Sequence, residues 1–88
     1  MKIKSDVLLR DVAGEKALFL QGRRVGETTK VVALNATSLL LWNELHEREF
    51  EVEDVAKVLV DHYVVGQATA MEDARRWVVT LTENGLIE

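Results

Sequence analysis

The most constraining feature of this 88-residue sequence is the run Leu39–Trp42, LLLW, inside the stretch ALNATSLLLWNEL. The stretch is otherwise typical of a helix over 36–46, because the side-chain oxygen of Asn35 can cap the first turn. An amphipathic helix spaces its large apolar residues three or four apart. Consecutive ones instead sweep roughly 300° of the circumference, at about 100° per residue. We therefore expect this helix to be covered on more than one side, in the centre of a domain.

The chain before this helix is typical of strands. Segments 7–12 (VLLRDV) and 16–20 (KALFL) are short and rich in Val, Leu and Phe. Gly14 between them can take the positive φ of a tight turn, which predicts a hairpin. Segment 30–34 (KVVAL) resumes the β-branched character after a polar, glycine-containing loop. The sequence therefore predicts a three-stranded antiparallel sheet.

Two further helices are predicted after the central one, over 52–64 and 69–84. Thr69 and Glu72 have the spacing of a capping box, and Gly85 stands where a helix C-terminus favours glycine. We expect Leu86 and Ile87 to pack back on the core. The predicted core stripes are Val52, Val55, Ala56, Leu59 and Tyr63 on one helix, and Ala70, Ala74, Trp77, Val78 and Leu81 on the other.

This order of elements predicts one α+β domain over residues 1–88, with a three-stranded N-terminal sheet followed by three helices, as in winged helix-turn-helix proteins. A content of 48% apolar and 30% charged residues is that of an ordinary globular domain. Its central helix should be core. Replacing Leu40 or Trp42 with Ala is therefore expected to cost about 2–5 kcal/mol of stability.

The sequence offers little for catalysis. It has no cysteine, and His46 and His62 lack the short spacing of zinc ligands. We expect no catalytic residue, no metal and no cofactor. A net charge of −4 disfavours nucleic acid as a partner. No apolar run approaches the roughly 20 residues of a membrane span, so we expect a soluble, cytoplasmic protein without membrane association.

One surface suits a peptide. If segment 28–34 ends the sheet, its outer backbone groups are unpaired and can accept an added strand. On the helix over 69–84, Val79 points away from the core stripe and lies near Arg75 and Arg76. Exposed apolar residues mixed with arginine are typical of recognition surfaces. A groove between a sheet edge and a helix would fit an extended chain. The same free edge could also pair with a second copy and give a homodimer.

The segments VVALNATSLLLWNEL, VEDVAKVLVDHYVV and EDARRWVVTLTENGLIE resemble the PqqD family, which is named for its member in pyrroloquinoline quinone biosynthesis. The resemblance covers about residues 7–88. It implies a non-catalytic peptide chaperone, or recognition element, for ribosomally synthesised and post-translationally modified peptides. Such a protein binds the leader of a precursor and presents it to a modifying enzyme, often a radical SAM protein.

The resemblance also implies where the leader binds, which is beside the third strand and against the third helix. Carried onto this chain, the expected peptide-binding residues are Thr28, Thr29, Lys30, Val31, Val32, Ala33, Arg75, Val78, Val79 and Thr82. The alternative is a winged-helix domain that binds DNA or another protein. A small hydrolase or metal enzyme would be a third class, and no group of residues in the sequence supports it.

Overall fold

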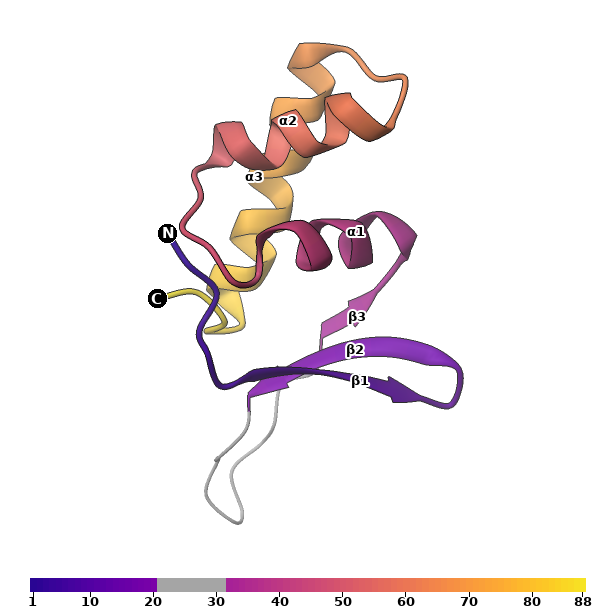
Figure 1. Ribbon diagram of the computed structural model, residues 1–88, viewed down its shortest axis with the longest axis vertical. Coiled ribbons are helices and arrows are strands. Elements are labelled where there is room, and N and C mark those ends of the chain that lie inside the picture. The colour runs from indigo at the N-terminus through magenta and orange to yellow at the C-terminus, as the bar shows by residue number, and fades with distance from the viewer. Residues whose placement is uncertain (21–31) are drawn as a thin grey trace.

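The computed structural model describes residues 1–20 and 32–88. Within these residues the predicted fold is confirmed: a three-stranded antiparallel sheet is followed by three helices (Figure 1). The helices are α1 (Ala36–Leu45), α2 (Val52–His62) and α3 (Gln67–Glu83). All three lie on the same side of the β1–β2 hairpin, which forms the base of the molecule in this view.

The sheet has the strand order β1-β2-β3, with β1 at Val7–Val12, β2 at Glu15–Leu20 and β3 at Val32–Leu34. Ala13 and Gly14 join β1 to β2 with φ angles of +53° and +84°. Two successive positive φ angles are typical of the hairpin turn whose twist matches that of its strands. The part of the third predicted strand before residue 32 lies outside the described residues.

Helix α1 starts as predicted, because the backbone N–H of Ser38 donates to Asn35 Oδ1 at 2.8 Å. The helix lies between the sheet and α2 (Figure 1). Its residues Leu41, Trp42 and Leu45 are buried. Leu40 is only half-buried and lies outside the core cluster, so the expectation that it is a core residue is wrong. A helix with apolar residues all round still leaves one side incompletely covered.

The predicted start of the third helix and its predicted capping box are also wrong. Helix α3 begins at Gln67 after the extended residue Gly66, so Thr69 is inside the first turn and does not cap it. Gln and Ala form helix readily and extend it towards the N-terminus. The capping box occurs instead at the start of α2, where Glu51 N–H donates to Asp54 Oδ2 at 2.8 Å.

The end of α2 differs from the prediction as well. Its stripe buries Val55, Ala56 and Leu59, but Tyr63 is 42% exposed. The helix ends at His62, and Tyr63 takes the extended values φ −132° and ψ 152°. A residue outside the helical period no longer follows the face of the helix, so Tyr63 leaves the core.

The chain ends are fixed to each other and to the core. Gly85 follows α3 with φ +69°, as predicted for a residue after a helix C-terminus. The chain then turns back, so that Leu86 is fully buried and Ile87 forms a β-bridge with Ile3. Lys4 N–H donates to the Leu86 carbonyl at 2.9 Å. The expected packing of the last residues on the core is confirmed.

Candidate functional site

Strand β3 is an edge of the sheet. It pairs with β2 in the register Lys16↔Leu34, Ala17↔Ala33 and Leu18↔Val32. Among the described residues, no strand pairs with its other side. Every second residue of such a strand directs its N–H and C=O groups outward, where they can bind another extended chain.

A groove of about 360 Å³ lies along this edge and separates β3 from α3. One wall comes from β3 and the start of α1, and the other comes from one face of α3. The lining residues are Val32, Ala33, Leu34, Asn35, Thr37, Ser38, Leu41, Leu59, Asp73, Arg76, Trp77 and Thr80. The volume is within the range of protein ligand sites.

The floor of the groove is apolar. Leu41, Leu59 and Trp77 contribute to it, and all three are buried in the core cluster. Trp77 also packs against Phe50, with ring centroids 6.2 Å apart. Its indole Nε1–H is buried and has no hydrogen-bond partner among the described residues. The groove is therefore continuous with the core and offers apolar surface at its base.

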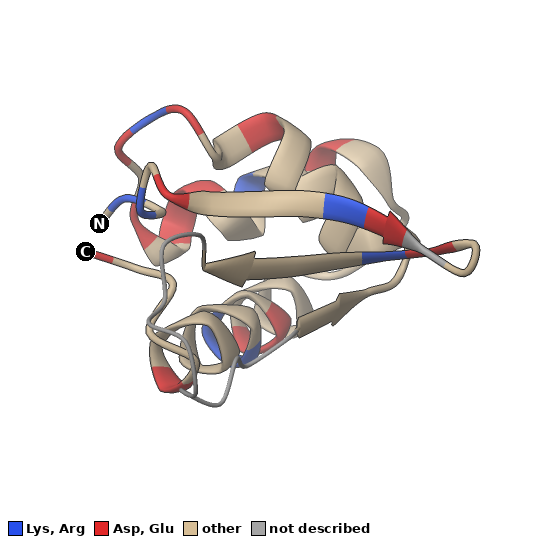
Figure 2. Ribbon diagram, turned by 90° about the horizontal axis from the view of Figure 1, so that it is seen from below, with Lys and Arg blue, Asp and Glu red and all other residues tan. Residues whose placement is uncertain are grey.

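The α3 wall carries charges that neutralise one another. Arg76 contacts Asp73 at 3.1 Å and Glu72 at 3.5 Å. Thr80 Oγ1 donates to the Arg76 carbonyl at 3.0 Å. In the view of Figure 2, blue and red segments are mixed along the elements. This wall therefore lacks the basic character that a phosphate backbone requires, and the DNA-binding alternative gains no support.

The structure brings only some of the expected peptide-binding residues into the groove. Thr28, Thr29, Lys30 and Val31 lie outside the described residues, while Val32 and Ala33 line the groove. Arg75, Val78, Val79 and Thr82 lie on α3 but are not among its lining residues. Val79 is 51% exposed, as expected for a residue that points away from the core. The role of all the expected residues in peptide binding stays a prediction.

The groove residues of α3 are absent from the expected peptide-binding set, but they follow the same spacing as that set. Asp73, Arg76, Trp77 and Thr80 are spaced i, i+3, i+4, i+7. The expected set, Arg75 to Thr82, is the same pattern shifted by two residues, which is roughly 200° around a helix. The two sets lie on either side of the buried stripe, and Trp77 belongs both to the stripe and to the groove set. A helical pattern predicts both flanks, but only tertiary packing decides which one faces β3.

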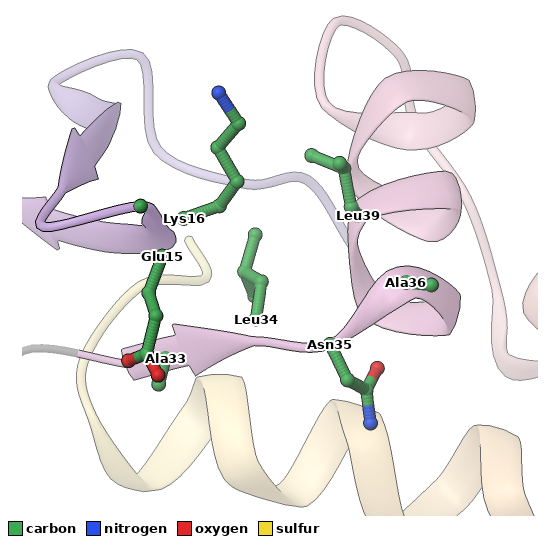
Figure 3. Close-up of a pocket in the computed structure, with 8 residues that line it drawn as sticks. Glu15, Lys16, Ala33, Leu34, Asn35, Ala36 and Leu39 are labelled. Carbon is green, nitrogen blue, oxygen red and sulfur yellow. The ribbon is translucent and has the colours of Figure 1, made fainter.

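A second, shallower hollow of about 530 Å³ adjoins the other side of β3, near the β1–β2 turn (Figure 3). Figure 3 shows Lys16 and Leu34 side by side on one face of the sheet, with Leu39 of α1 opposite them. The Lys16 ammonium is paired with Asp11 at 2.9 Å, and both side chains are about half exposed. This hollow shares Ala33, Leu34 and Asn35 with the groove, so both cavities meet at the end of β3.

Within the described ranges, no group of His, Asp or Glu side chains could hold a metal ion. The helices that the structure describes are also too short or too polar to cross a membrane.

Residues 20–87 match the family model described as "Coenzyme PQQ synthesis protein D (PqqD)". The chain belongs to the PqqD family. The match includes β3 and α3, so both walls of the groove lie within the PqqD region. Comparison with curated protein sequences finds no match.

A solved structure of similar fold is "TbiB1 in Complex with the TbiA(beta) Leader Peptide". The TM-score is 0.75 at 24% sequence identity, and the likeness covers 100% of this chain and 95% of the other. The fold is therefore shared over the entire length of the chain.

Proposed function

We propose that the protein binds the leader segment of a ribosomally synthesised precursor peptide as an added strand beside β3. The observation that carries this proposal is the groove between the unpaired edge of β3 and α3. Membership of the PqqD family supports it, and so does the likeness to TbiB1, which was solved with a leader peptide.

In the groove, backbone groups and side chains would contribute differently to recognition. Main-chain hydrogen bonds to β3 give affinity that depends little on the peptide sequence. In an extended peptide successive side chains point to opposite faces, so every second residue would face the apolar floor at Leu41, Leu59 and Trp77. Specificity would then come from apolar residues at alternate positions of the leader.

The protein would act without catalysing a reaction. A bound leader raises the effective concentration of the precursor at an enzyme that binds the same complex. A radical SAM enzyme is the partner class that the sequence resemblance implies. A role with newly made precursors would place the protein in the cytoplasm.

Titration with synthetic leader peptides tests the proposal. The peptides should be taken from short reading frames next to the gene, and amide chemical shifts should be followed by NMR. We expect shifts at Val32 and Ala33 and along α3 from Asp73 to Thr80. Failure of every such peptide to bind at high micromolar concentration, or a response confined to α2, would refute the proposal.

Two adjacent arginines distinguish the two flanks of α3. Arg76 lines the groove, whereas Arg75 lies on the flank expected from the sequence. Arg76→Ala should weaken leader binding more than Arg75→Ala, because only Arg76 would contact a peptide in the groove. A loss confined to Arg75→Ala would instead place the peptide on the flank expected from the sequence.

Sedimentation of the free protein would show whether the β3 edge also pairs with a second copy.

A further inference from the structure

The connection between α2 and α3 is unusually apolar for an exposed turn. It contains Tyr63, Val64 and Val65 in succession. Tyr63 is well exposed, and Val64 is fully exposed at 110%. Val60, one turn earlier on α2, is also exposed. We call Val60, Tyr63 and Val64 the α2-end patch.

The α2-end patch is more than scattered exposure. A single exposed valine on a protein surface is normal. Among the described residues, however, three of the four exposed large hydrophobic side chains are in this patch, and Val79 is the fourth. Val65 beside them packs against the core, which fixes the backbone that presents Tyr63 and Val64. Apolar residues gathered in this way are typical of contact surfaces.

The patch adjoins one end of the groove. Thr37 lines the groove, and its Oγ1 donates to the Tyr63 hydroxyl at 3.3 Å. In Figure 1 the start of α1, which follows β3, and the end of α2 lie at the same side of the molecule. A chain that runs along β3 and passes Asn35 therefore meets Thr37 next and Tyr63 immediately beyond it.

The surroundings of the patch are polar but nearly neutral. His62 Nε2 lies 4.0 Å from Glu44 Oε1, and Lys57 and Asp61 are exposed on the same helix. No single charge sign dominates, so attraction to a charged ligand is not the basis of recognition here. An apolar centre with an aromatic ring and a polar rim is the composition of a peptide or protein contact.

We propose that the α2-end patch is a second contact site for the bound peptide, which receives apolar residues that flank the segment paired with β3. This inference rests on the proposed function and extends its footprint past Thr37. The leader would then need two apolar elements: alternate residues for the groove, and a separate apolar residue for Tyr63 and Val64.

Peptides selected from a random display library for binding to the wild-type protein would serve as the probe. A length of about 20 residues, at about 3.3 Å per residue, exceeds the 44 Å longest dimension of the protein. Each selected peptide is then truncated from either end to the shortest segment that still shifts the amides of β3 and α3. The affinities of the long and short forms are measured by fluorescence anisotropy.

The variants are Val64→Ser and Tyr63→Ser, with Glu53→Ser at the other end of α2 as the control. Val64→Ser keeps the fold, because the side chain is fully exposed. We expect both patch variants to weaken the long peptide by about fivefold or more. The truncated peptide should change by less than about twofold, as should either peptide with Glu53→Ser.

Three results would overturn the inference. If the patch variants leave the long peptide unaffected while β3 and α3 still respond, the patch is not a peptide contact and the proposed function stands. If no selected peptide shifts the amides of β3, both the proposed function and this inference fail. If the wild-type protein forms a dimer that Val64→Ser abolishes, the patch binds a second copy instead.

Discussion

Leu41 and Leu45 allow packing and recognition to be separated by one experiment. They lie one turn apart on α1 and are 2% and 0% exposed. Only Leu41 also lines the groove. Each Leu→Ala change removes similar buried volume and should cost about 2–5 kcal/mol of unfolding free energy. A domain of 88 residues has about 4–13 kcal/mol in total, so both variants should be clearly less stable.

Peptide binding should distinguish the two variants. Leu41 is 2% exposed, so its truncation removes the few atoms that reach the floor, and the loss of several atom contacts at about 0.1–0.2 kcal/mol each costs up to about 1 kcal/mol. That corresponds to about a fivefold increase in Kd for a peptide bound in the groove. Leu45→Ala leaves the floor intact, so its Kd should equal that of the wild type once the folded fraction is taken into account.

Urea denaturation followed by circular dichroism gives the stabilities, and anisotropy with a labelled peptide gives the Kd values. If stability proves too low, the milder Leu41→Val and Leu45→Val pair serves the same comparison. Equal weakening of binding by both variants would show that the loss reflects general loosening of the core. An unchanged Kd for Leu41→Ala would mean that the peptide does not reach this floor.

Three further predictions concern local features. Ala13→Asn should raise the unfolding free energy by about 0.5–1 kcal/mol in thermal denaturation. The reason is that Asn tolerates the left-handed backbone at φ +53° better than Ala. No change in the unfolding free energy would show that the turn is unstrained. Asn35→Ala should lower stability by about 1 kcal/mol in urea denaturation through loss of the cap on α1, and unchanged stability would contradict that role. In a Trp42→Phe background, peptide binding should shift the emission of Trp77, which lines the groove. The Trp77→Phe variant is the control, and a shift seen only there would move the site away from the groove.

Local patterns were sufficient for the elements of the fold. The β-branched segments, the glycine in the hairpin turn and the Asn35 cap act through nearby residues, so their predictions agree with β1, β2 and the start of α1. The capping box was assigned to the wrong helix, because Thr69 and Glu72 satisfy the spacing although the helix starts earlier. Spacing alone does not fix where a helix begins.

The sequence by itself determined the order of strands and helices and the central place of α1, and it predicted a peptide-binding surface at an edge strand. Only the tertiary structure decided which flank of α3 faces β3, that Leu40 is left half-buried, and that Tyr63 leaves the core stripe. The physical reason is that hydrophobic periodicity defines a buried face but not the partner on either side of it. The rotation of a helix against its neighbours depends on how all side chains of the core pack together.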